Sequence, residues 1–466
     1  MTRAPRALDS EAPRDENRRM TTPPLPPALR SSRVAQTVRY VLDPVRLFDD
    51  AQRRLGDVFV MRVLDQTWVV LTHPDHVREV FAHGPDDLDS GLANISLRPL
   101  LGTRNDLLLD GAEHLRRRRL VLPPFHGERM RANEDVIPDT TRRELATRPL
   151  GVAAPTLPRM QAITFRVVLR AVFGVQEGPD LERLATRLQR FVAWAVDPRR
   201  GLVFTVLGPE RLMGLKAYRR QHEDLDRELL AEIARRRAAP DLVEREDILS
   251  LLLQARDEQG APLTDHELRD ELVTLLVAGH ETTAAALSWA LVELARAPAA
   301  QVRLAAGEEG LAEAAVAETL RLHPPLPVGA VRRLRRPLTI AGWDLPAGTT
   351  LALSTLLAHR RPDVYDEPGA WRVDRFLHER PPAGAWLPFG GGVRRCVGAA
   401  FAQFEARTVL DEITRTLELR GTGPASRWVA RRGIVLVPSR GGRVIAVRRA
   451  VRPAAPVAAP VAGAAA

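Results

Sequence analysis

The single cysteine of this chain, Cys396, ends the glycine-rich run 389–396 and precedes an apolar stretch that favours a helix. A helix N-terminus presents unpaired backbone N–H groups and the positive end of its dipole, and both favour a thiolate over a thiol. The glycines before the sulfur allow a flat ligand to approach the backbone closely. Arg394 can face an anionic group on that ligand. A thiolate with one open face is how a protein holds haem iron for O–O bond cleavage.

Two alternatives for the cysteine are a small buried hydrophobe and a nucleophile beside a histidine base. Neither explains the spacing of the run, and the nearest upstream histidine is His378. The run resembles, position for position, the haem-binding loop of cytochromes P450. The resemblance implies a b-type haem with Cys396 as its iron ligand. The matched positions that would surround the cofactor are Phe389, Gly392, Arg394 and Gly398.

The composition is that of a large folded protein, with 466 residues of which 45% are hydrophobic. One cysteine excludes disulfides within the chain and suits a reducing compartment. No stretch approaches the roughly 20 apolar residues that a membrane-spanning helix needs. The first residues lack the apolar core of a signal peptide. We therefore expect a cytoplasmic protein without a transmembrane anchor.

The formal net charge of +10 raises the question of nucleic-acid binding. However, Lys216 is the one lysine among 68 basic residues, which indicates a general bias toward arginine. The segment 420–466 holds nine arginines and no acidic residue, so it supplies nine of the ten excess charges. Basic and aromatic residues do not alternate as they do where bases are stacked. Nucleic acid is therefore not an expected partner.

Both ends of the chain are expected to be disordered, because 1–27 is rich in charge and proline and 451–466 consists largely of alanine, proline and valine. Residues 28–450 show no repeat and no long linker, and we expect one catalytic domain that is mostly helical. Short strands are predicted toward its two ends: 58–63 with 68–71, 338–340 with 343–345, 351–354, and 434–437 with 444–447.

A long central helix is predicted from a capping box, Thr264 and Glu267, which opens a pattern that continues without proline to Ala297. At 1.5 Å per residue, about 33 residues give roughly 50 Å, enough to cross a domain. The centre of this helix, 278–283, holds a glycine and two threonines, which are poor helix formers. Such a local conflict is expected at a functional site.

This centre resembles the oxygen-binding groove of the P450 central helix. The resemblance places the family's acid–alcohol pair on Glu281 and Thr282. The alcohol would hold dioxygen and its water, and the carboxylate would supply the protons that the reaction consumes. A packing kink made of small residues is the alternative. His280 is expected to be structural or linked to solvent.

Glu318 and Arg321 stand one helical turn apart among apolar residues, so they are expected to be buried, and buried charges must be networked. They resemble the family's Glu-x-x-Arg motif, whose third member would be Arg375. The resemblance implies a structural role for the three, which would lock the loop leading to Cys396.

His114 and Arg118 share one helical face at i,i+4 spacing. They resemble the family's helix that clamps a haem propionate. Arg394 matches a second propionate ligand and Arg332 a third, with Arg333 as the alternative after a one-residue slip. Haem carries two carboxylates, for which arginines are suitable bidentate partners.

The remaining arginines near these positions are expected to form a basic patch on the thiolate side of the haem, and that patch would steer an acidic ferredoxin. Its members are Arg116, Arg117, Arg119 and Arg395. The chain continues for only 70 residues after Cys396 (466 − 396). We therefore expect electrons from a separate ferredoxin and ferredoxin reductase.

By the same resemblance, the substrate pocket is lined by 88–109, 191–207, 272–282, 326–331 and the turn around Ile434. These segments are mainly apolar, and an apolar pocket favours an apolar substrate. Together with the haem loop, they suggest a terpenoid, a fatty acid or another lipid-like intermediate of secondary metabolism.

The fold that the resemblance implies is mainly α with small β-sheets (α+β). It is a triangular prism with haem between the central long helix and the helix after Cys396. The implied activity is that of a monomeric haem-thiolate monooxygenase, which uses O2 and two electrons to hydroxylate or epoxidise an apolar small molecule. A peroxide-driven peroxygenase is one alternative, and the Glu281–Thr282 pair argues against it. The other alternative is an inactive P450-like partner protein, against which the intact motifs argue.

Overall fold

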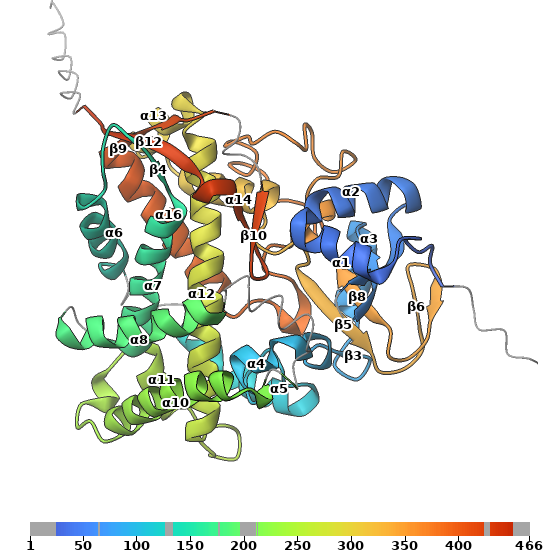
Figure 1. Ribbon diagram of the computed structural model, residues 1–466, viewed down its shortest axis with the longest axis horizontal. Coiled ribbons are helices and arrows are strands. Elements are labelled where there is room, and N and C mark those ends of the chain that lie inside the picture. Colours follow the sequence, from blue (N-terminus) through green and yellow to red (C-terminus); the bar gives the residue numbers. More distant parts are fainter. Residues whose placement is uncertain are drawn as a thin grey trace, which may run out of the picture.

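The structure is a computed structural model that describes residues 25–63, 66–125, 134–175, 178–195, 211, 213–423 and 429–450. Helices make up most of it, with small sheets beside and between them (Figure 1). The mainly α fold with small β-sheets is therefore confirmed. The terminal segments predicted to be disordered lie outside the described residues, except for 25–27. There, the Pro27 carbonyl accepts a hydrogen bond from the Val60 backbone at 2.8 Å.

The helices follow the chain in order. They are α1 (Arg33–Leu42), α2 (Pro44–Leu55), α3 (Pro74–Ala82), α4 (Arg98–Leu101), α5 (Gly111–Val121), α6 (Val136–Ala146), α7 (Leu157–Phe173), α8 (Pro179–Ala195), α10 (Lys216–Arg237), α11 (Ile248–Gln254), α12 (Asp265–Leu294), α13 (Pro298–Ala305), α14 (Leu311–Leu322), α15 (Thr355–Ala358) and α16 (Ala399–Thr416).

The strands form four sheets among the described residues. They are β1 (Val58–Val63), β2 (Gln66–Leu71), β3 (Leu88–Asp89), β4 (Ala153–Pro155), β5 (Ala330–Leu334), β6 (Leu338–Ile340), β7 (Trp343–Leu345), β8 (Thr350–Leu353), β9 (Leu417–Gly421), β10 (Val429–Arg432), β11 (Val435–Pro438) and β12 (Arg443–Arg448). The largest sheet has the order β1-β2-β8-β5-β3, and a smaller one has the order β4-β12-β9. β6 pairs with β7, and β10 pairs with β11.

The predicted strands are present, but one predicted pairing is wrong. β1 pairs with β2 and β6 with β7, as expected. β11 and β12 do not pair with each other: β11 pairs with β10, and β12 with β4 and β9. The reason is the turn between them, where Arg440 and Gly442 both have positive φ and redirect the chain into another sheet.

Helix α12 is the central element of the molecule (yellow in Figure 1). Its capping box is present: Thr264 accepts from the Glu267 backbone, and the Glu267 carboxylate accepts from the Thr264 backbone. With 30 residues it is about 45 Å long. It ends at Leu294, three residues before the predicted end. Pro298, the first residue of α13, disfavours helical geometry at Ala297, whose φ is −121° and ψ 69°.

Among the described helices, α12 is long and apolar enough to cross a membrane. This differs from the expectation that no stretch of the sequence is apolar enough. However, 72% of its most apolar window is buried inside the molecule. Buried residues lie on nearly every face, including the charged Arg269, Asp270 and Glu271. A helix that is apolar all round is typical of the core of a large protein.

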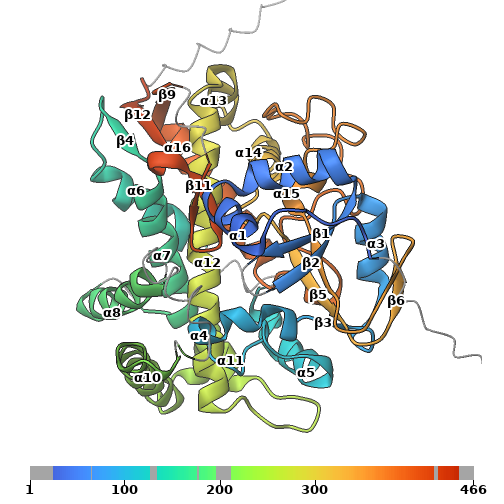
Figure 2. The same cartoon turned by 45° about the vertical axis from the view of Figure 1, so that its right-hand side comes forward.

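The two sides of α12 differ in architecture, as Figures 1 and 2 both show. Helices α6, α7, α8 and α10 lie on one side, and the five-stranded sheet with α1, α2 and α3 lies on the other. Each side has its own hydrophobic packing, with one cluster around α12 and α7 and two around the sheet. The chain that carries Cys396 runs between the helical and the sheet clusters.

Candidate functional site

The Cys396 loop lies where the two kinds of core meet. Leu387 is buried in a cluster of the five-stranded sheet, whereas Phe389 and Val397 pack against the helical cluster around α12. Both ends of the loop are therefore held by apolar packing that comes from distant parts of the sequence.

Backbone hydrogen bonds close the loop. The Cys396 N–H donates to the Phe389 carbonyl at 2.9 Å, and the Arg395 N–H donates to the Gly392 carbonyl at 3.1 Å. Helix α16 follows directly, with Gly398 as its N-cap, so that only two residues separate the cysteine from the first helical residue. The predicted position of the cysteine, just ahead of a helix N-terminus, agrees with this geometry.

The glycines of the loop are required for reasons other than the predicted access of a flat ligand. A side chain at Gly391 would stand 2.4 Å from the Phe81 ring. Gly390 and Gly392 have φ of 62° and 63°, a conformation that other residues rarely adopt. Gly398 has open space where a side chain would stand. Close packing on α3 and the turn itself therefore account for the first three glycines.

Cys396 is exposed, although protein surrounds its side chain on most sides. Burial raises the pKa of its thiol, and Asp106 acts in the same direction. The backbone N–H of Gly398 and the charges of Arg118 and Arg395 lower that pKa, but by less. The helix end thus favours the thiolate as predicted, but in the chain alone desolvation outweighs it.

Arg394 and Arg118 converge on the segment that precedes α5. Arg394 donates to the Asp106 carbonyl at 2.9 Å and to the Asp110 carboxylate at 2.7 Å. Arg118 donates to the Arg395 carbonyl at 2.5 Å, and its guanidinium lies 3.6 Å from the Asp106 carboxylate. Two predicted cofactor ligands from distant parts of the sequence are therefore brought together beside Cys396.

His114 joins this group from the same face of α5. It is 1% exposed, and its Nε2 lies 3.2 Å from the Asp106 carboxylate. Neither ring nitrogen makes a hydrogen bond with any described residue. His114 therefore keeps unused hydrogen-bonding capacity within a buried charged cluster.

Arg332, rather than Arg333, points to the Cys396 loop. It is 7% exposed and donates to the Gly391 carbonyl at 3.2 Å and to its neighbour's carbonyl, Val331, at 2.8 Å. Arg333 is exposed, because adjacent residues of strand β5 face opposite sides. Burial, with the charge of Arg394, lowers the pKa of Arg332 to about 10.

Three of the four members of the predicted basic patch are paired with acidic residues. Arg117 is buried and forms ion pairs with Glu267 and Glu271. Arg116 donates to Asp257 at 2.5 Å, and Arg119 pairs with Glu258.

These acidic partners all come from the approach to α12 or from its first turns. Each acidic residue lies between 139 and 154 positions further along the chain than the arginine it binds, so local sequence did not reveal these pairs. Arg119 and Arg395 are both exposed, and of the two Arg395 forms no ion pair with a described residue.

On α12, Thr282 is half-buried and its hydroxyl donates to the Ala278 carbonyl one turn earlier, at 2.7 Å. Ala278 is exposed, although the residues around this part of the helix are largely buried. The helix therefore presents a small accessible strip at the position where the sequence predicts the oxygen-binding groove.

Glu281 is 4% exposed and lies in a polar network on another face of α12. Its carboxylate accepts from Gln161 on α7 at 2.9 and 3.0 Å. His280 Nε2 and Arg432 Nε each lie 3.4 Å from it. Although burial opposes it, the contacts with His280, Arg432 and Gln161 lower the pKa of Glu281. The carboxylate is therefore held ionised, and it does not hydrogen-bond to Thr282.

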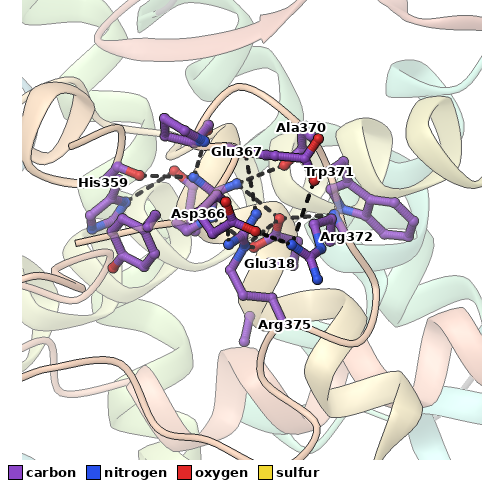
Figure 3. A network of polar contacts seen from close by, with 12 residues as sticks. Glu318, His359, Asp366, Glu367, Ala370, Trp371, Arg372 and Arg375 are labelled. Atoms are coloured by element: carbon purple, nitrogen blue, oxygen red, sulfur yellow. Dashed lines mark hydrogen bonds and ion pairs between the residues drawn. The ribbon is translucent and has the colours of Figure 1, made fainter. Parts of the chain in front are cut away.

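The Glu318 network is buried and saturated (Figure 3). Arg321 binds both carboxylate oxygens of Glu318, at 2.7 and 2.8 Å, and Arg375 binds both at 3.1 Å. The Arg372 backbone donates to the same carboxylate at 2.9 Å. The remaining guanidinium donors of Arg321 bind the carbonyls of His359, Pro368 and Ala370. The three residues that the sequence predicts to act together are in contact.

Comparisons with known proteins identify the family of this chain. The sequence profile described as Cytochrome P450 matches residues 23–307 and 310–441. The chain is 38% identical over 434 residues to a protein of Mycobacterium tuberculosis named as cytochrome P450 135A1, covering 91% of this chain and 96% of the relative. The chain belongs to the cytochrome P450 family. A second relative, named as cytochrome P450 138 of Mycobacterium bovis, is 36% identical over 436 residues and covers 91% of this chain and 97% of its own.

Solved structures support the P450 fold. The retinoic-acid-bound cyanobacterial CYP120A1 superposes with a TM-score of 0.78 at 22% identity, covering 92% of this chain and 100% of that one. The haem domain of cytochrome P450DA gives 0.75 at 21% identity, covering 92% and 98%. As a P450, the protein is a haem-dependent monooxygenase, an oxidoreductase that uses O2 and depends on electron-transfer partners.

The residues present fit a haem. Buried Arg332 has no carboxylate partner among the described residues, and buried His114 makes no hydrogen bond with them. A buried charge without an adjacent counter-charge is unfavourable, so Arg332 points to an anionic group from outside the chain, and the unused ring nitrogens of His114 can hydrogen-bond to the same group. Haem carries two propionates, and Cys396 would hold its iron as the thiolate, since a coordinated thiol loses its proton.

One residue of the site was missed by the sequence analysis. His359 is fully buried, its Nδ1 lies 3.1 Å from the Arg321 carbonyl, and its Nε2 accepts from the Leu387 backbone at 2.6 Å. It therefore connects the Glu318 network to the start of the Cys396 loop. Burial lowers its pKa to about 3. Its place after a short helix, without a motif of its own, gave no signal in the sequence.

Gln161 and Arg432 were missed for a similar reason. Each holds Glu281 from a distant element, α7 or β10. Nothing in the spacing of either residue distinguishes it from an ordinary helical glutamine or one of the many arginines near the C-terminus.

Proposed function

We propose that this P450 binds b-type haem through Cys396 and inserts one oxygen atom of O2 into an apolar small molecule. The observation that carries the proposal is the convergence of Cys396, Arg394, Arg118, His114 and Arg332 from three separate segments. Haem supplies the iron at which O2 is activated. In this assignment, the propionates bind Arg332, which has no ion-pair partner among the described residues, and His114, whose ring nitrogens make no hydrogen bond with them.

The thiolate assignment is tested with the carbon monoxide difference spectrum of the reduced protein. The wild type should give the long-wavelength Soret band that is diagnostic of thiolate ligation, and Cys396→Ser should lose it. Arg395→Gln is a matched control on the neighbouring residue, which is exposed and unpaired among the described residues. A wild type without the band, or a Cys396→Ser variant that keeps it, would remove the basis of the proposal.

Thr282 and Glu281 are proposed to manage oxygen and protons. Thr282 lies on the accessible strip of α12, where its hydroxyl can turn from the Ala278 carbonyl to a bound molecule. Glu281 is ionised in the interior and touches Arg432, whose side chain is 39% exposed. This contact supports a proton path from solvent, past Arg432, to Glu281; because the two side chains are not hydrogen-bonded, the proposed last step from Glu281 to Thr282 requires a bridging water.

A matched pair of variants tests the alcohol. Thr282→Ala should lower the yield of oxygenated product per electron consumed by about 10²-fold, the size of effect expected for a positioned acid–base group. Thr283→Ala is the control, because Thr283 is adjacent but buried on another face. An equal loss in both variants would indicate damage to the helix rather than a role for the hydroxyl.

The substrate is proposed to be a terpenoid, a fatty acid or a similar apolar intermediate of secondary metabolism, because the described segments expected to line the pocket are mainly apolar. Part of one expected segment, 196–207, lies outside the described residues. We further propose a monomeric cytoplasmic enzyme that receives electrons from a separate ferredoxin and ferredoxin reductase. Exposed Arg395, next to the cysteine, supports docking of an acidic partner at this face.

A further inference from the structure

A pocket of about 250 Å³ lies between the end of α6, β4 and the start of α7. Figures 1 and 2 show these elements on the side of α12 that faces away from the five-stranded sheet. Its walls are mainly apolar, made of Pro149, Ala154, Pro155, Pro158 and Ala162. Two arginines, Arg148 and Arg159, complete the lining. None of these residues belongs to the site around Cys396.

Arg148 is the unusual member of the pocket. It is 7% exposed, and its Nε and Nη2 are buried without a hydrogen-bond partner. It forms no ion pair with any residue that the structure describes. Burial and the charge of Arg159 both lower the pKa of Arg148. A guanidinium in this position is strongly unfavourable unless an anion joins it.

The acidic residues nearby are already engaged. The Glu144 carboxylate lies 2.9 Å from Arg159 and 3.4 Å from Arg166. Arg166 also pairs with Glu182 at 2.7 Å. The two glutamates are therefore matched by these two arginines, and the positive charge of Arg148 remains without a counter-charge.

We propose that this pocket binds a small monocarboxylate with an apolar body, whose carboxylate pairs with Arg148 and whose body lies against the prolines and alanines. At about 30 Å³ for each water-sized group, the volume holds roughly eight non-hydrogen atoms. A six-carbon monocarboxylate has this size. Inorganic anions match the charge but leave the apolar walls uncovered.

Thermal unfolding of the haem-loaded full chain tests the site, with hexanoate as the probe, hexanol as its neutral analogue and sulfate as an anion without an apolar body. Hexanoate should raise the melting temperature of the wild type by a few degrees, and hexanol and sulfate should not. Calorimetric titration should give an affinity at least tenfold weaker for Arg148→Met. The haem Soret band should not change, which separates this site from binding at the haem.

Two further variants keep the test decisive. Ala162→Leu fills the pocket without changing its charge and should also abolish binding. Arg143→Met, on the exposed face of α6, is the matched control and should bind like the wild type. Without ligand, Arg148→Met should unfold at a temperature equal to or above that of the wild type, because an unpaired buried charge is removed.

The proposal is overturned if hexanoate fails to bind, if sulfate binds equally well, or if Arg148→Met keeps the wild-type affinity. A shift of the Soret band that persists in Arg148→Met would place the carboxylate at the haem instead.

Discussion

Two buried charged clusters of this P450 differ in how completely the chain satisfies them. Around Glu318, both carboxylate oxygens and the guanidinium donors of Arg321 have partners within the protein. Around Arg332 and His114 the match is incomplete: Arg332 binds two carbonyls but forms no ion pair with a described residue, and the ring nitrogens of His114 make no hydrogen bond with one. The difference separates structural from ligand-binding charge: a saturated cluster stabilises the fold by itself, and an unsaturated one is completed by a molecule from outside.

The largest effect is expected where the chain is saturated. Glu318→Gln removes the charge between two buried arginines and should destabilise the protein by about 3–5 kcal/mol. The measurement is urea unfolding together with the yield of haem-loaded protein. The control is Glu313→Gln on the same helix, where a half-exposed pair with Arg407 is worth about 1 kcal/mol or less. Equal losses in the two variants would contradict the special role of the buried cluster.

His359 tests whether the same cluster reaches the Cys396 loop. His359→Asn should destabilise the folded protein by roughly 1–3 kcal/mol at neutral pH, because the buried Leu387 N–H loses its acceptor. Burial lowers the pKa of His359 to about 3 in the folded protein. Between about pH 3 and 6.5, its imidazole is therefore neutral in the folded protein and protonated in the unfolded chain.

Wild-type stability should therefore fall as pH drops through this window. The advantage of the wild type over His359→Asn should shrink by about 1.4 kcal/mol per pH unit below about pH 6. Urea unfolding of both proteins between pH 7 and 4 measures this, and a difference that stays constant with pH would show that His359 is not held neutral.

Arg332 tests the unsaturated cluster. Arg332→Met should speed the transfer of haem to a scavenging protein by about tenfold or more, because a charge-assisted contact to a propionate is lost. Arg333→Met, on the exposed face of the same strand, should change the rate by less than about twofold. If Arg333→Met had the larger effect, the one-residue slip would be the correct assignment.

Sequence alone predicted the parts of this molecule that lie in local motifs. The capping box of α12, the strands of the N-terminal hairpin and the contact between Glu318, Arg321 and Arg375 are all present. The residues that sequence missed, His359 and Gln161, act through contacts with distant elements. The pairing of β11 and β12 failed because a turn with positive φ, rather than strand propensity, decides which sheet each strand enters.

The arginines of α5 show the same limit, because their acidic partners are distant in sequence. A substitution at one of them has the smallest predicted effect. Four adjacent arginines indicate a basic surface, but Arg119 is paired with Glu258, an exposed contact worth about 1 kcal/mol or less. Arg119→Gln should therefore barely change stability, and it should change the rate of reduction by an acidic ferredoxin by less than about twofold. Arg395→Gln should slow that reduction several-fold at low salt and less at high salt, because no described acid offsets its charge. If Arg119→Gln slowed reduction as much as Arg395→Gln, the acidic residues before α12 would not neutralise the arginines of α5. The predicted basic patch would then act as a docking surface.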